Sequence, residues 1–177
     1  MPLHDRKLTM AELVRVAPHA YRSRRKVVVV LDDVRSRHNV GSIFRSADSF
    51  GIEAVHLCGF TPCPPHREIE KTALGATASV PWQHHGKVIG CLEGLRAQGH
   101  VVIAIEQTEA ALPMQQYPVE TDRPLALVLG NELSGVSEEV VTFADRCIVI
   151  PQFGSKHSLN VSVCAGIVLW WFAGREH

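Results

Sequence analysis

Short runs rich in valine, isoleucine and leucine recur along the chain, and they constrain its fold more than any other feature. The runs occupy residues 27–31, 53–57, 101–105, 125–129 and 147–150. Runs of this kind are typical of strands that are buried on both faces of a parallel sheet. The segments between them carry apolar residues at helical spacing, for example Val40, Ile43, Phe44 and Ala47. This alternation predicts an α/β fold, in which helices flank a parallel sheet.

The 177 residues are enough for one domain with a well-buried core, and no long linker divides them. We expect an N-terminal arm at residues 1–25, followed by a single domain at residues 26–177. Thr9 and Glu12 have the spacing of a capping box, which predicts a short helix in the arm. A basic run at residues 21–26 leads into the first strand.

Composition restricts the compartment and the partners. Eighteen basic residues balance eighteen acidic ones, so any attraction for nucleic acid must come from local clusters. No signal peptide or membrane span is evident, and the five cysteines lack CxxC spacing, which favours reduced thiols in the cytoplasm. Cys58, Cys63 and His66 are candidate metal ligands, but the set is incomplete for tetrahedral binding. We therefore interpret that stretch as a proline-rich loop and expect no metal.

The last apolar segment, residues 159–173, is hydrophobic nearly all round and contains two adjacent tryptophans, Trp170 and Trp171. A surface helix would have one polar face, so this segment must be covered on most sides. A small domain has difficulty enclosing such a terminal helix, which favours burial in a homodimer interface. A purely internal core helix is the alternative.

Residues 37–45 lie where a strand passes into a helix, a junction whose free N–H groups and helix dipole suit an anion. Asn39 is a candidate helix cap, and Gly41 permits close approach of another backbone. The helical spacing points Arg45 out of the core. A solvated arginine beside an ordinary cap fits these residues as well.

Residues 130–137 directly follow the apolar run 125–129. Ligands of open parallel sheets bind beyond the carboxyl ends of strands, and this is such an end. Gly130 permits a tight turn, while Asn131 and Glu132 place polar groups at the rim. Ordinary turn glycines, with Ser137 as the cap of a helix at 138–144, are the alternative.

Residues 150–162 form the third polar loop, between the last strand and the last helix. Ser158 and Asn160 lie at the start of a very apolar helix, where polar groups are costly unless they are hydrogen-bonded. They are candidate site residues for that reason. The alternative is that Ser158 caps the helix and Asn160 bonds to the backbone.

Taken in order, the three loops resemble the three motifs of the SpoU/TrmH branch of the SPOUT RNA methyltransferases. The resemblance covers residues 26–173 and is carried by Asn39-x-Gly41-x-x-x-Arg45, Gly130-Asn131-Glu132 with Gly135, and Ser158-Leu159-Asn160-Val161-Ser162. It implies a C-terminal deep trefoil knot, whereas general folding rules alone predict an unknotted doubly wound sheet. It also implies a homodimer formed through the first and last helices.

The resemblance further implies transfer of a methyl group from S-adenosylmethionine to a ribose 2′-hydroxyl of a structured RNA, either tRNA or rRNA, without a metal. The implied cofactor-binding residues are Gly130, Asn131, Ile150, Leu159 and Glu106. The implied catalytic residues are Arg45, Asn39, Glu132, Ser158 and Asn160.

Each implied catalytic residue has a role. Arg45 would stabilise negative charge on the reacting oxygen and hold the adjoining phosphate, because a guanidinium stays protonated. Asn39 would orient Arg45 or the ribose, and Glu132 would position Arg45 or the substrate. Ser158 and Asn160 would fix the reacting groups.

RNA would be held by basic residues that contact phosphates, with a steep dependence on salt. The candidates are Arg24, Arg25, Arg37 and Arg45. A solvated basic arm is the alternative for the first two.

Two other functions compete with this interpretation. The first is a catalytically silent RNA-binding protein that retains the knotted fold, and the presence of Asn39, Arg45, Glu132 and Asn160 argues against it. The second is a nucleotide-dependent oxidoreductase of Rossmann type, but no GxGxxG follows the first strand.

Overall fold

A computed structural model describes residues 6–13, 26–118, 123–155 and 157–174 of the chain. The strands are β1 (Val27–Asp32), β2 (Ala54–Cys58), β3 (Trp82–His85), β4 (Val101–Ile105), β5 (Leu112–Pro113), β6 (Leu125–Leu129) and β7 (Arg146–Val149). The helices are α2 (Arg37–Ser49), α3 (Arg67–Ala73), α4 (Ala76–Ser79), α5 (Val88–Ala97), α6 (Glu138–Phe143) and α7 (Val161–Gly174), with a 3₁₀ turn at Met114–Gln116.

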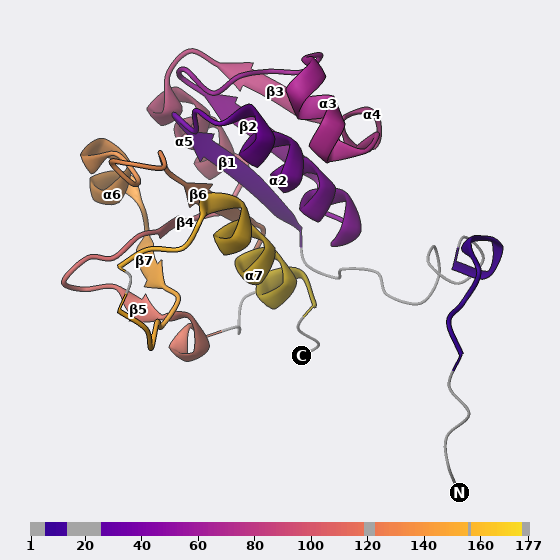
Figure 1. Ribbon diagram of the computed structural model, residues 1–177. Coiled ribbons are helices and arrows are strands. Elements are labelled where there is room, and N and C mark those ends of the chain that lie inside the picture. Colours follow the sequence, from indigo (N-terminus) through magenta and orange to yellow (C-terminus); the bar gives the residue numbers. More distant parts are fainter. Residues whose placement is uncertain (1–5, 14–25, 119–122, 156, 175–177) are drawn as a thin grey trace, which may run out of the picture.

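The seven strands form one sheet in the order β3-β2-β1-β6-β4-β7-β5, and every pair of neighbours is parallel (Figure 1). The predicted parallel α/β sheet is therefore confirmed. All five predicted strands are present, with ends that differ by at most one residue. The apolar pattern did not predict β3 and β5, because β3 is a polar, mostly exposed strand at one edge and β5 is only two residues long.

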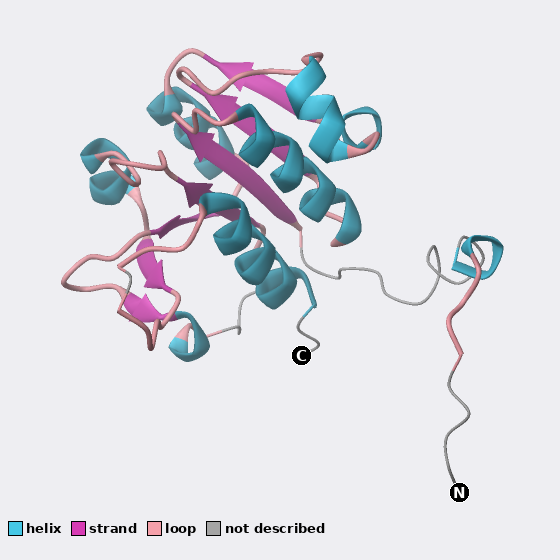
Figure 2. Ribbon diagram, viewed as in Figure 1, coloured by secondary structure: helices cyan, strands magenta, loops and turns pink. Residues whose placement is uncertain are grey.

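Helices cover both faces of the sheet (Figure 2). Helices α2, α3, α4 and α7 share one apolar core, and α5 and α6 lie over the other. Strand residues alternate between these cores: Val29 and Leu31 of β1 face the first, whereas Val28 and Val30 face the second. Because both faces are buried, the central strands β4 and β6 are apolar throughout instead of alternating with polar residues.

The helix starts differ from the expected caps. Ser36, and not Asn39, is the N-cap of α2, and its hydroxyl accepts the N–H of Asn39 at 3.3 Å. Asn160, and not Ser158, supplies the side-chain oxygen at the start of α7, where Oδ1 accepts the N–H of Ser162 at 2.9 Å. Ser137 does precede α6, but it makes no side-chain cap bond.

The short helix expected in the arm is present at residues 10–13. The Thr9 N–H donates to Glu12 Oε2 at 2.8 Å, and the Glu12 N–H donates back to Thr9 Oγ1 at 3.4 Å. This exchange is the predicted capping box.

Helix α7 is only partly covered by the rest of this chain. Ala165, Val168 and Leu169 are buried against the α2 side of the sheet, but Trp170 is 60% exposed and Val163 is 51% exposed. The alternative of a purely internal core helix therefore does not hold for these two side chains, and burial in a homodimer interface stays a prediction. In the described parts of the chain, no helix has the length and apolar character needed to cross a membrane.

Candidate active site

A cavity of about 530 Å³ opens at the carboxyl ends of β4, β6 and β7. Its walls combine the segments that follow these three strands, namely residues 105–107, 129–135, 148–150, 152, 157–161 and 164. The second and third polar loops of the sequence therefore meet at one site. Its size is within the range of small-molecule and cofactor pockets.

Two glycines shape the loop after β6. The backbones of Asn131 and Gly135 exchange two hydrogen bonds of 2.9 Å, which folds the loop back on itself. A Cβ at Gly130 would lie 2.1 Å from the carbonyl carbon of Gly135. Only glycine therefore fits where the two arms of this loop come together. Gly135 has a φ of +72°, a backbone conformation that residues with a Cβ rarely adopt.

Glu106 ties this loop to the end of β4. Its Oε2 accepts the N–H of Val136 at 2.8 Å, and its Oε1 accepts the N–H of Gln107 at 2.8 Å. Glu106 lines the cavity, as expected of a candidate cofactor contact. Both carboxylate oxygens nevertheless already hold backbone groups, so its evident task is to fix the cavity wall.

Asn131 also uses its side chain within the protein. Its amide donates to the carbonyl of Asp33 at 2.7 Å, and its Oδ1 accepts the N–H groups of Leu133 and Ser134. The side chain therefore joins the loop after β6 to the end of β1. A ligand beside Asn131 would meet mainly backbone.

Glu132 connects the second loop to the first. Its Oε2 accepts the N–H of Arg35 at 2.9 Å, while its Oε1 accepts the N–H of Ser36 and the side-chain amide of Asn39, both at 2.9 Å. A carboxylate at this position complements the positive end of α2. Glu132 thus holds the start of α2 and contacts Asn39 directly.

The third loop joins the same network through Asn160, whose amide donates to Oδ1 of Asn39 at 3.2 Å. Oδ1 of Asn160 in turn accepts the hydroxyl of Ser162 at 2.7 Å. Asn39 therefore lies between Glu132 and Asn160, which are distant in sequence. We call this hydrogen-bonded set, Glu132, Asn39 and Asn160, the bridging triad.

The network also sets the ionisation of Glu132. Partial burial alone would raise its pKa, but hydrogen bonds from the N–H of Arg35, the amide of Asn39 and the N–H of Ser36 outweigh that effect and lower it. Glu132 is therefore a carboxylate at neutral pH. In that form it can only accept hydrogen bonds.

Most of the predicted site residues line the cavity, and these are Glu106, Gly130, Asn131, Glu132, Ile150, Ser158, Leu159 and Asn160. Arg45 does not line it: it is exposed on α2, six residues or about 9 Å along the helix axis from Asn39. Arg37 lies at the start of α2, 3.6 Å from Glu68. Arg24 and Arg25 lie outside the described residues.

Sequence reasoning missed several residues that shape the site. The amide of Gln107 donates to the carbonyl of His157 at 2.6 Å, which joins the segment after β4 to the third loop. Asp32, at the end of β1, accepts the N–H of Ser137 at 2.9 Å. Their position at strand ends was the available signal, since that edge of a parallel sheet is where sites form.

Residues 26–170 match the SpoU rRNA Methylase family. The tRNA (guanosine(18)-2'-O)-methyltransferase of Escherichia coli K12 is 29% identical over 144 residues, which are 81% of this chain and 61% of the relative. The protein of the same name from Thermus thermophilus is 31% identical over 165 residues, which are 93% of this chain and 83% of the relative. This chain therefore spans about six-tenths of the first relative's length and most of the second's.

A solved structure shares the fold. The AdoMet-bound rRNA methyltransferase from Sinorhizobium meliloti superposes with a TM-score of 0.77 at 29% identity. The match covers 82% of this chain and 54% of that one. The parallel sheet and its flanking helices are thus shared with that structure.

Proposed function

We propose, because the chain belongs to the SpoU rRNA methylase family, that it transfers a methyl group from S-adenosylmethionine to a ribose 2′-hydroxyl of tRNA or rRNA. The observation that carries this proposal is the bridging triad at the cavity. It brings Asn39 of the first motif to Glu132 of the second and Asn160 of the third. A protein that only bound RNA would have no need of a cavity joined to all three motifs.

The cavity suits S-adenosylmethionine in size and in the character of its walls. Its volume of about 530 Å³ lies in the range typical of cofactor sites. Gly130 lets the loop after β6 pack closely against the backbone of Gly135, while the polar atoms of Asn131 and Glu106 are hydrogen-bonded within the wall itself. Backbone near Gly130, Ile150 and Leu159 is thus left to contact the cofactor. When bound, S-adenosylmethionine supplies a methyl group activated by a positively charged sulfur.

The residues of the chain would then prepare the hydroxyl. A ribose hydroxyl is a weak nucleophile until its proton leaves, so a group that stabilises negative charge on oxygen assists the reaction. Arg45 is our candidate for that group. Asn39 and Asn160 would orient the ribose, Ser158 lies exposed at the same cavity, and Glu132 would hold Asn39 in place.

A homodimer would explain how Arg45 takes part. The α2 side chain of Arg45 is exposed and is absent from the cavity wall of its own chain. Helices α2 and α7 pack side by side, and α7 leaves Trp170 and Val163 exposed. A second copy that covers this face would bury both side chains and bring its cavity close to Arg45. Trp170→Glu should then yield monomers in sedimentation velocity, whereas equal dimer content in the variant would contradict this interface.

A C-terminal trefoil knot fits the strand order. Strand β7 lies between β4 and β5, although a short segment connects β4 directly to β5. The chain after β7 contacts that segment through Gln107 and His157, and the ring of Phe172 on α7 meets Tyr117 at 5.6 Å. We propose that the last part of the chain passes behind the segment 106–118, which follows β4.

The RNA would approach over the rim of the cavity. Phe153, on the third loop, is 99% exposed and offers a ring on which a base can stack. Arg37 at the start of α2 would contact phosphate. We assign the same role to Arg24 and Arg25, which belong to the proposed arm (residues 1–25) that precedes the domain at residues 26–177. The five free cysteines fit the reducing cytoplasm as the place of action.

Methyl transfer from labelled S-adenosylmethionine to total tRNA and rRNA tests the proposal. We expect label in ribose 2′-O-methyl groups, and we expect Arg45→Ala to lower kcat/KM by about 10²- to 10³-fold while the cofactor Kd stays the same. Arg146→Ala is the matched control and should retain full activity. Arg146 is exposed at the first position of β7, and the cavity lies at the other end of that strand.

Two outcomes would contradict the proposal. Binding of RNA without any transfer would favour the catalytically silent RNA-binding protein. Equal transfer by wild type and Arg45→Ala would remove Arg45 from the mechanism.

A further inference from the structure

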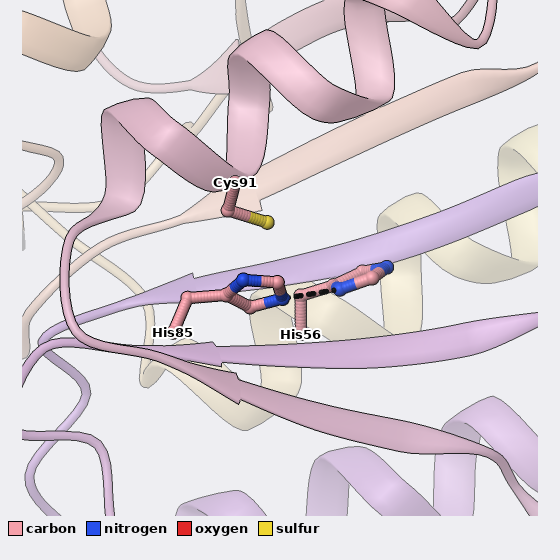
Figure 3. A group of neighbouring side chains, drawn as sticks. All are labelled: His56, His85 and Cys91. Atoms are coloured by element: carbon pink, nitrogen blue, oxygen red, sulfur yellow. Dashed lines mark hydrogen bonds between the residues drawn. The ribbon is translucent and has the colours of Figure 1, made fainter.

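Histidine and cysteine side chains gather between β2, β3 and α5 (Figure 3). His56, His85 and Cys91 each offer one ligand atom, and these atoms lie within 4.8 Å of one another. Among the residues that the structure describes, they are the one group of three or more potential ligands found this close together. None of them lines the cavity, so the cluster is separate from the proposed active site.

The two imidazole rings already face each other. Nδ1 of His56 and Nε2 of His85 are 2.9 Å apart, which requires a hydrogen on one nitrogen and a lone pair on the other. When each ring carries its hydrogen on the nitrogen that points away, both facing nitrogens offer a lone pair to a metal ion. Cys91 extends from α5 toward the rings, with its sulfur on the same side as their facing nitrogens (Figure 3).

The spacing is close to that of a tetrahedral site. Bond lengths of zinc to nitrogen and sulfur place neighbouring ligand atoms of a tetrahedral site about 3.3–3.8 Å apart. The pair of nitrogens is slightly closer than this, and no ligand atom of the group is more than 4.8 Å from another. We expect side-chain rotations to bring these three atoms to the spacing of a bound ion.

Cys58 is the candidate for a fourth ligand, although it is not one of the three residues whose ligand atoms lie within 4.8 Å of one another. It lies two residues after His56 on β2, so both side chains point to the same face of the sheet, and it pairs with His85 of β3 in the ladder. Cys58 is 0% exposed and Cys91 is 4% exposed, which leaves no open side for water at the sulfurs.

We propose that His56, Cys58, His85 and Cys91 form a structural zinc site. Two nitrogens and two sulfurs are a set that zinc prefers, and four protein ligands leave no position for a substrate. The ion would fasten β3, the four-residue edge strand, to β2 and α5. Sequence spacing does not indicate this set, and the three residues it did suggest are apart: Cys63 donates to the Thr61 carbonyl and His66 caps α3.

Metal analysis of the full chain, purified under reducing conditions and passed over a desalting column after addition of Zn²⁺, tests the proposal. We expect about one zinc per chain. Replacement by Co²⁺ should give visible bands of a tetrahedral site together with a thiolate-to-cobalt charge-transfer band. Stoichiometry near zero, or a cobalt spectrum without the thiolate band, would overturn the site.

Single substitutions locate the ion. Loss of a residue that only hydrogen-bonds to a metal ligand typically lowers metal affinity by ~10–100-fold. Cys91→Ser and His85→Asn remove ligands, so each should weaken zinc binding by more than that. His84→Asn is the matched control, because His84 is adjacent in sequence but bonds to the Gly59 carbonyl. Cys63→Ser is a second control. Retention of zinc by the two ligand variants, or its loss in either control, would place the ion elsewhere and refute the assignment.

X-ray absorption at the zinc edge of the unsubstituted protein covers the case in which the variants do not fold. Two nitrogen and two sulfur ligands are expected. A shell of oxygen and nitrogen alone would contradict the proposal, and so would a disulfide between Cys58 and Cys91 that persists in reductant. Because these readouts do not involve methyl transfer, they are independent of the proposed function.

Discussion

The cavity and the histidine–cysteine cluster use polar residues in opposite ways. Around the cavity, Glu106, Asn131 and Glu132 direct their side chains to backbone groups of neighbouring loops. In the cluster, His56 and His85 direct their side chains to each other. The first arrangement fixes backbone around an open space, whereas the second concentrates lone pairs at one point.

The two arrangements suit different ligands. A space walled by backbone and glycine recognises a molecule by shape and hydrogen bonds. Converging nitrogen and sulfur atoms suit a metal ion. Damage to one region should therefore leave the other intact, and four predictions examine that separation.

Gly130→Ala should have the largest effect. Its Cβ would meet backbone of Gly135 at 2.1 Å, so the loop after β6 must move, and we expect cofactor affinity to fall by about 100-fold or more. Isothermal titration with S-adenosylmethionine measures the loss. Gly154→Ala is the matched control, since nothing lies within 4 Å of the Cβ added there. Zinc content should not change in either variant, and parallel loss of zinc would show that the regions are coupled.

Removal of zinc with a chelator should do the reverse. We expect the midpoint of thermal unfolding to fall by several degrees, because the edge strand β3 loses its attachment to α5. The Kd for S-adenosylmethionine should remain within about twofold, since no ligand of the cluster lines the cavity. If removal of zinc leaves the Tm unchanged, the bound ion has no structural role.

Glu132→Gln should reveal a pH-dependent contribution to stability. The folded protein lowers the pKa of Glu132, so its stabilising effect is complete above the unfolded value of about 4.3 and is lost as pH falls through the folded value. The Tm difference between wild type and Glu132→Gln should thus be larger at neutral pH than in acid. Glu93→Gln, at an exposed position on α5, serves as the control. A difference that grows in acid would reverse the assigned sign.

Arg37→Ala should have the smallest effect. Arg37 is half-exposed and 3.6 Å from Glu68, which offsets part of its charge. We expect a several-fold loss of RNA affinity, with the slope of log K against log salt reduced by about one. Glu68→Gln should change affinity in the opposite direction, and a larger loss in that variant would indicate that Arg37 does not contact phosphate.

Much of the fold could be predicted because local patterns encode it. The runs that became β1, β4 and β6 are apolar along their whole length, and this alone indicated a sheet buried on both faces. Strand β3 escaped prediction because its edge position leaves most of its side chains exposed, and β5 because two residues are too few to form a pattern. Caps were less predictable, since Ser36 and Asn39 compete for the same role within one turn.

The candidate site divides in a similar way. Gly130, Glu132 and Asn160 were found from sequence because loops at strand ends and polar groups beside apolar helices are local features. Their partners were not predictable: Glu132 bonds to Arg35 and Asn39, which precede it by more than ninety residues. The prediction that Arg45 acts at the cavity stays a prediction, because its own chain leaves it exposed.

Local sequence specified the five apolar strands, most of the helices, the glycines that permit tight turns and the polar residues available at the loops, because each depends on the chemistry of a few neighbouring residues. Only the folded chain reveals that β7 lies between β4 and β5, that Asn39 meets both Glu132 and Asn160, and that His56 faces His85. Such pairings depend on strand order and register. These are set by the packing of the whole core and leave no periodic trace in the chain.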